Sequence, residues 1–151
     1  HFILPIAAIR GEGTSNDYFP REVPALPSFK MHKFVSEKLV EHNYEYRTGV
    51  IYTTNRRVWE HDRKFKKRLE RLTVLGIDME TATIFSTAFY NEIPTGAILL
   101  VSDQPMIVDG VKTEASDKVV TNSYVDLHLK IGIESLKQLI NNGITVKHLR
   151  Y

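Results

Sequence analysis

Cysteine is absent from the 151 residues of this chain. Disulfide bonds, thiolate nucleophiles and zinc–thiolate sites are therefore excluded, and a reducing cytoplasm fits the absence. An excess of charge of one sign is also missing, because the formal net charge is +2, which argues weakly against a dedicated nucleic-acid-binding protein. No apolar run approaches the length of a membrane span. We therefore expect a cytoplasmic protein that binds neither nucleic acid nor membrane.

A metal-binding pattern is missing as well. The six histidines include no HExxH motif and no pair four residues apart, so we expect neither a metal nor a cofactor. The sequence also lacks an initiator methionine and a signal-peptide pattern, and it opens directly into a strand-like apolar run. We therefore expect the chain to begin inside a domain and to lack that domain's N-terminal part.

The apolar patterns that are present alternate between strand-like and helix-like periods. Short apolar runs predict strands at residues 2–9, 44–54, 74–77 and 95–102. Helical spacing predicts helices at residues 28–43, 58–71, 79–91 and 117–142, with loops at 11–27 and 104–116. This order predicts a layered α/β fold. With no repeat or linker, we expect residues 1–151 to form one domain.

The predicted helices have apolar faces that should meet the core. In the helix over residues 79–91 we expect four side chains to point inward, namely Ile84, Phe85, Ala88 and Phe89. The basic residues between Arg63 and Arg71 surround apolar positions at helical spacing, which is typical of the solvated face of an amphipathic helix.

Two carboxylates, Glu80 and Asp103, lie in otherwise apolar segments. Asp103 follows the last predicted strand, and ligands of open α/β sheets gather outside the carboxyl ends of strands. An Asp between a strand and a proline such as Pro105 is also common in turns. The four residues around Asp103, taken alone, favour a turn over a catalytic role. Glu80 opens a predicted helix, where the helix dipole favours an acid without any function. For Met79, core packing is an equally good interpretation.

A third group of candidate residues follows the strand predicted at residues 44–54. Asn55, Arg56 and Trp59 combine an aromatic ring, a cation and an amide within five positions. Such a set can stack on a nucleobase while the arginine binds phosphate. The alternatives are that Trp59 anchors a core or an interface and that Arg56 is simply solvated.

Five segments, taken in order, resemble the nucleoside phosphorylase and nucleosidase superfamily and, within it, the AMP nucleosidases. They are YRTG (46–49), NRRVWE (55–60), DMETATI (78–84), VSDQP (101–105) and VDLHLKIGI (125–133). The resemblance implies a layered mixed sheet flanked by helices, and an enzyme that hydrolyses the N-glycosidic bond of AMP to adenine and ribose 5-phosphate. It also implies that this chain is the C-terminal portion of the catalytic domain, inactive without the missing segment.

The resemblance implies roles for individual residues. Asp103 would protonate the departing purine, while Glu80 and Met79 would grip the ribose. The base and phosphate environment would include Trp59, Arg56, Asn55 and Ser102. Three cations are candidates for phosphate binding by position only, with plain surface exposure as the alternative: Arg10, Lys112 and Lys118.

Two other functions stay open. A phosphorolytic purine or uridine nucleoside phosphorylase would use the same acid and the same ribose grip. A truncated, non-catalytic binding or assembly module is the second, because the long loop at 11–27 carries aromatic residues suited to a contact surface. The expected partners are a purine nucleotide or nucleoside, phosphate in the phosphorolytic case, and further copies of the chain in a dimer or hexamer.

Overall fold

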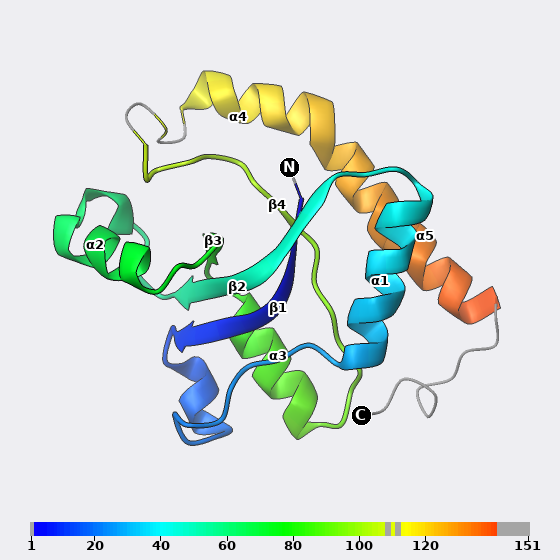
Figure 1. Ribbon diagram of the computed structural model, residues 1–151, viewed down its shortest axis with the longest axis horizontal. Helices are drawn as coiled ribbons and strands as arrows, with labels where there is room; N and C mark the ends of the chain where they lie inside the picture. Colours follow the sequence, from blue (N-terminus) through cyan, green and yellow to red (C-terminus); the bar gives the residue numbers. More distant parts are fainter. Residues whose placement is uncertain (1, 108–109, 111–112, 142–151) are drawn as a thin grey trace.

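Four strands form one mixed sheet in the computed structural model, which describes residues 2–107, 110 and 113–141 (Figure 1). The order across the sheet is β3 (Gly76–Asp78), β2 (Tyr46–Thr54), β1 (Phe2–Gly11) and β4 (Leu99–Leu100). The pairs β1–β2 and β2–β3 are parallel, whereas β4 runs antiparallel to β1. The predicted layered mixed sheet is confirmed.

Helices cover both faces of the sheet. Those that pack on it are α1 (Phe29–Glu41), α2 (Arg63–Arg71), α3 (Thr81–Tyr90) and α5 (Asp126–Asn141), and a further helix, α4 (Glu114–Val120), precedes α5. Short 3-10 turns occupy Thr14–Asp17 and Trp59–His61, and a π-helical segment at Thr121–Val125 joins α4 to α5. None of the helices in the described part of the chain is both long and apolar enough to cross a membrane.

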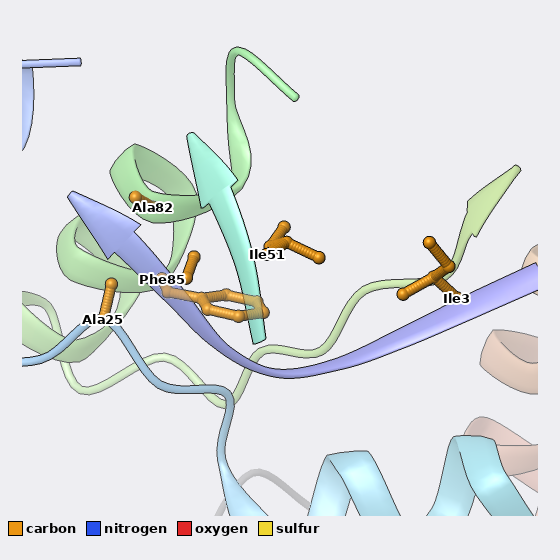
Figure 2. Packing of buried hydrophobic residues seen from close by; sticks show 6 residues of the cluster. Ile3, Ala25, Ile51, Ala82 and Phe85 are labelled. Carbon is orange, nitrogen blue, oxygen red and sulfur yellow. The ribbon is translucent and has the colours of Figure 1, made fainter. Parts of the chain in front are cut away.

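The strands bury different residues on their two faces because successive side chains alternate. On one face, Phe85 and Ala82 of α3 belong to one buried cluster with Ile3, Ile51 and Ala25. Figure 2 shows Phe85, Ala82, Ala25 and Ile51 near one another, with Ile3 farther along β1. On the other face, α1 and α5 cover the amino-terminal part of β1 through a cluster of Phe2, Leu4, Val35, Leu39 and Ile131. The face that carries Tyr52 is covered by α2 through Phe65 and Leu69.

A bulge in β1 changes which residues face α3. The register shifts between Pro5 and Ala7, so that Ile6 is an extra residue without a partner in β2. Ile3 and Ala8 are five positions apart, yet both join the cluster around Phe85. In an unbulged strand an odd separation would place them on opposite faces. The bulge therefore keeps one continuous apolar surface beneath α3.

The last strand is shorter than its sequence pattern predicts. Side chains alternate between the two faces in the strand predicted at residues 95–102, because Ala97, Leu99 and Val101 pack on one cluster while Ile98 and Leu100 pack on the other. Only Leu99 and Leu100 pair with β1, however. The carbonyl of Ile98 instead accepts a hydrogen bond from His128 Nε2 at 2.8 Å. A side chain of α5 thus replaces part of the strand ladder.

The helices also depart from prediction in detail. Helix α2 begins at Arg63 instead of Val58, because the Asp62 carboxylate accepts the amides of Lys64 and Phe65 and caps the helix there. The inward face predicted for α3 is wrong at two positions, since Ile84 is 52% exposed and Phe89 is 47% exposed. The basic residues of α2 face solvent as predicted while Phe65 and Leu69 are buried.

Replacing Phe85 by alanine tests the packing of α3. Phe85 is fully buried, so Phe85→Ala should lower the free energy of unfolding by about 3–5 kcal/mol through lost contacts and a residual cavity. Ile84→Ala, one position earlier and half-exposed, should cost no more than about 1 kcal/mol. Denaturant titration of both variants measures the difference, and equal losses would contradict this core.

Candidate active site

A cavity of about 650 Å³ lies beside the segment that follows β4. Asp103, Ser102 and Trp59 are among its lining residues, so three of the predicted site residues meet there. The rest of the wall comes from the amino ends of β1 and β2, from α2, and from the approach to β3 up to Ile77. The volume lies within the range of small-molecule sites.

Asp103 is half-buried at the edge of this cavity. The Ser102 hydroxyl donates a hydrogen bond of 2.5 Å to Asp103 Oδ1, and this bond fixes the direction of the carboxylate. Ser102 therefore orients the acid, an arrangement that the sequence pattern did not specify.

The edge of the sheet at which Asp103 lies differs from the one predicted. Because β4 is antiparallel to β1, with Leu100 opposite Phe2, the carboxyl end of β4 lies at the amino ends of the three parallel strands. Glu80 follows β3 at the opposite, carboxyl edge. Asp103 therefore follows the carboxyl end of its own strand, but that end does not lie beside the carboxyl ends of β1, β2 and β3.

Glu80 and Met79 lie in the turn that leads from β3 into α3. Glu80 is exposed, and its Oε2 accepts a hydrogen bond of 3.2 Å from the Met79 amide. Met79 is 36% exposed. The apolar surroundings predicted for Glu80 are wrong, because α3 begins only at Thr81 and buries Ala82 and Phe85 against the sheet, away from Glu80. Among the described residues that line the cavity, neither Glu80 nor Met79 is present.

Trp59 both packs against a neighbouring aromatic ring and lines the cavity, two environments that the sequence allowed. Its ring is half-buried and packs edge-on against Phe65, with ring centroids 6.3 Å apart. It also lines the cavity that contains Asp103. The tryptophan is thus both a packing anchor and part of the cavity wall.

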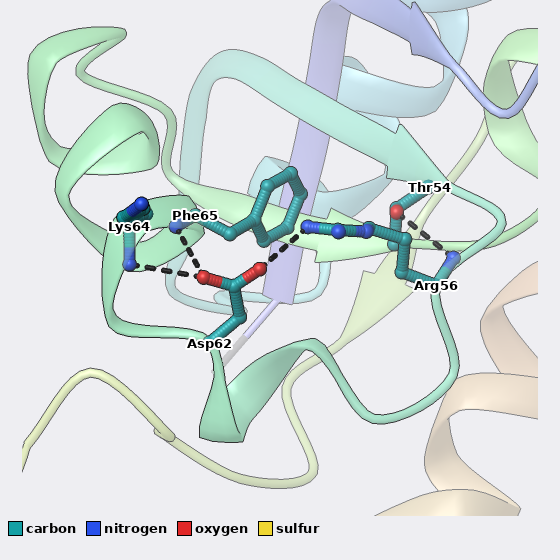
Figure 3. A network of polar contacts seen from close by, with 5 residues as sticks. All are labelled: Thr54, Arg56, Asp62, Lys64 and Phe65. Carbon is teal, nitrogen blue, oxygen red and sulfur yellow. Dashed lines mark hydrogen bonds and ion pairs between the residues drawn. The ribbon is translucent and has the colours of Figure 1, made fainter.

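Arg56 and Asn55 follow β2 directly but lie outside the cavity lining. Arg56 Nη1 donates a hydrogen bond of 2.8 Å to Asp62 Oδ2, and its guanidinium lies 5.0 Å from the centre of the Phe65 ring, as Figure 3 shows. The hydrogen bond from the Phe65 amide, followed by the contact with this arginine and the bond from the Lys64 amide, holds the pKa of Asp62 below its ordinary value. Arg56 therefore braces the start of α2, and Asn55 is exposed.

The family follows from comparison with known proteins. Residues 1–137 match the family model described as the phosphorylase superfamily. The chain belongs to the phosphorylase superfamily. This membership agrees with the mixed sheet flanked by helices and with the resemblance carried by the sequence motifs.

Solved members of the superfamily share the fold of this chain. It is 44% identical to an AMP nucleosidase from Bacteroides thetaiotaomicron VPI-5482, with a TM-score of 0.74, over 95% of this chain and 54% of that one. A uridine phosphorylase from Vibrio fischeri ES114 is 24% identical with a TM-score of 0.76, over 91% of this chain and 56% of that one. The second likeness shows the fold alone.

A curated superfamily member matches at lower identity. The AMP nucleosidase of Escherichia coli (strain K12) is 26% identical over 151 residues, which is 94% of this chain and 31% of that protein. The chain thus spans about a third of this curated relative and about half of the solved ones.

Arg10, a predicted phosphate ligand, donates its hydrogen bonds to the loop that follows β1. The guanidinium donates to the carbonyls of Ser15, Phe19, Pro20 and Val23 at 2.6–2.8 Å, and to the side chains of Ser15 and Asn16. Binding a phosphate would require these bonds to be exchanged, so we leave Arg10 out of the proposed site.

The other two cations predicted as phosphate ligands are Lys118 and Lys112. Lys118 is exposed and pairs with Glu114 at 2.8 Å. Lys112 lies outside the described residues. Within the described part of the chain, no cluster of three or more His, Cys, Asp or Glu side chains is placed to hold a metal ion.

Glu12 is a buried carboxylate that the sequence interpretation did not single out. It accepts hydrogen bonds of 2.9 Å from the amides of Gly13 and Ser15 and from the Thr83 hydroxyl. Burial alone would raise the pKa of Glu12, but hydrogen bonds from Ser15 and Thr83 outweigh it, so the pKa lies below its ordinary value. The signal was an acid between two glycines at the end of a buried strand.

The glycines on either side of Glu12 are required by the geometry. A Cβ on Gly11 would lie 2.2 Å from Tyr52 Cε1, and Gly13 has a φ of 94°, which side-chain-bearing residues rarely adopt. Glu12 is thereby aimed back at the first turn of α3, so the loop after β1 and the turn carrying Glu80 are tied together.

The lowered pKa of Glu12 predicts a pH dependence of stability. The stabilisation is fully present above the ordinary pKa, about 4.5, and is lost as the pH falls through the lower pKa of the folded state. Glu12→Gln should reduce stability at pH 7 by roughly 1–3 kcal/mol and make the further loss below pH 4.5 less steep. Glu22→Gln, exposed on the same loop, should do neither. Urea titrations from pH 7 to 3 measure both effects, and an unchanged acid slope would contradict the assignment.

Proposed function

We propose that this chain carries the proton donor and the ribose grip of an N-glycosidase that hydrolyses AMP to adenine and ribose 5-phosphate. The observation that carries the proposal is the 44% identity to an AMP nucleosidase over 95% of the chain. The position of Asp103 at a cavity large enough for a small molecule supports it. Localisation in the cytoplasm and assembly into homo-oligomers stay predictions.

The chemistry explains why an acid is needed. A purine anion is a poor leaving group, so cleavage of its bond to ribose requires a proton at the base in the transition state. The sugar then develops oxocarbenium character, as in glycoside hydrolysis generally. Asp103 would supply the proton, with Ser102 fixing the carboxylate's direction, and Trp59 would offer a flat apolar surface to the base.

The ribose grip depends on Glu80. One ionised carboxylate can accept hydrogen bonds from two adjacent hydroxyls, such as those at the 2′ and 3′ positions. Ile77 lines the cavity and Glu80 follows three residues later. Since an extended chain spans at most about 3.6 Å per residue, the two Cα atoms are within about 11 Å. The proposal therefore requires a ligand with its base at Asp103 to reach beyond Ile77, so that its ribose meets Glu80.

A phosphorolytic nucleoside phosphorylase is the second candidate. A uridine phosphorylase from Treponema pallidum is 28% identical over 109 residues, which is 66% of this chain. The two reactions differ in their products. Hydrolysis of AMP gives ribose 5-phosphate without added phosphate, whereas phosphorolysis of a nucleoside gives ribose 1-phosphate and requires phosphate. Product analysis with and without phosphate separates them.

Replacing the proton donor tests the assignment. In the full-length protein encoded by the gene, Asp103→Asn should lower kcat for adenine release by roughly 100- to 10,000-fold. Asp17→Asn, an exposed aspartate on the 3-10 turn after β1, should leave kcat unchanged. Near wild-type turnover by the Asp103 variant would remove this residue from the mechanism.

A further inference from the structure

The turn between β3 and α3 is held by side-chain hydrogen bonds from two residues to which the site prediction gave no role. We propose that Asp78 and Thr53 are positioning residues that fix Glu80 where the ribose is bound. The inference rests on the proposed function, because it assumes that Glu80 grips the ribose. It adds the reason why the backbone that carries this exposed carboxylate has a defined position.

The contacts form a closed set around the start of α3. Asp78 Oδ1 accepts a hydrogen bond of 2.6 Å from the Thr53 hydroxyl. Asp78 Oδ2 accepts the amide of Thr81 at 2.7 Å and that of Glu80 at 3.4 Å. The Thr53 hydroxyl oxygen in turn accepts the amide of Ala82 at 2.9 Å. The first amides of a helix have no partner within it, and here β2 and β3 supply the partners.

Glu80 takes part in this set only through its backbone amide. Its side chain is exposed and makes no capping bond to α3, and among the described residues its carboxylate accepts a hydrogen bond from the neighbouring Met79 amide. Packing therefore does not hold its carboxylate, and its location is set by the backbone that carries it. That backbone is anchored through Asp78 on one side and through the amides of Thr81 and Ala82 on the other.

A third anchor reaches the same turn of helix from β1. The Thr83 hydroxyl donates a hydrogen bond of 2.9 Å to Glu12 Oε1. Residues at the ends of β1, β2 and β3 therefore all bind the beginning of α3. Thr53 is fully buried, and water does not compete for its hydroxyl. The backbone that carries Glu80 is thus fixed relative to the sheet, and a binding group misplaced by about 1 Å can cost on the order of 100-fold in rate.

Thr53→Val is the sharpest test because valine matches threonine in shape and removes only the hydroxyl. Affinities should be measured by calorimetry on the full-length protein. One ligand is adenine; the other is an AMP analogue whose base and ribose are joined by a carbon–carbon bond, which hydrolysis cannot cleave. We expect Thr53→Val to lower the affinity for the analogue by about 10- to 100-fold and to leave the affinity for adenine unchanged. Thr53→Ser keeps the hydroxyl and should bind the analogue nearly as the wild type does.

A double-mutant cycle with Glu80→Ala separates positioning from general damage. If Thr53 acts through Glu80, then Thr53→Val adds no further loss of analogue affinity once Glu80 is alanine. Equal weakening of adenine and analogue, or losses that add, would overturn the inference. Asp78→Asn, which leaves only one acceptor oxygen, should reproduce the selective loss and covers the case in which Thr53→Val fails to fold.

The cycle also distinguishes this inference from the proposed function. If Glu80→Ala alone leaves analogue affinity intact, the ribose grip is refuted and the positioning role falls with it. If Glu80→Ala weakens the analogue while neither Thr53→Val nor Asp78→Asn does, the proposed function stands and only the positioning role is wrong.

Discussion

The parallel pairing of β1, β2 and β3 is the constraint on which the other placements depend. Its register sets Arg10 opposite Thr53 and Thr53 opposite Asp78, so these three polar residues stand in one row near the carboxyl edge of the sheet. Arg10 ties down the loop after β1, and Thr53 with Asp78 ties down the start of α3. A register slip of one residue would turn every side chain of a strand to the opposite face and would break both sets of bonds.

The antiparallel strand β4 gives the site its second component. Its direction sends the chain past the amino edge of the sheet, where Ser102 and Asp103 line the cavity together with Trp59. Asp103 and Glu80 therefore lie at opposite edges of the sheet, and the chain up to Ile77 of β3 lines the cavity on the way from one to the other. In this arrangement the reacting bond would lie along β3, between a base held near Asp103 and a ribose held near Glu80.

Much of the fold could be predicted from the sequence because it is encoded locally. Apolar runs located the strands, and helical spacing with the long loop at 11–27 gave the layered order. Long-range contacts could not be predicted in this way. The antiparallel direction of β4 depends on its pairing with β1, which is distant in the sequence. The exposure of Glu80 depends on where α3 begins. Arg10 donates hydrogen bonds to loop carbonyls as far as thirteen residues away. The residue types in the motifs indicated the chemistry. They did not indicate that Glu12 and Asp103 accept hydrogen bonds from neighbouring side chains while Glu80 is exposed.

The most direct test of the account is a crystal structure of the full-length protein with the uncleavable AMP analogue bound. The account predicts an Asp103 oxygen at about 2.6–3.2 Å from a ring nitrogen of the base, and both ribose hydroxyls within the same range of the Glu80 carboxylate. A base bound away from Asp103, or a ribose that Glu80 does not contact, would contradict it.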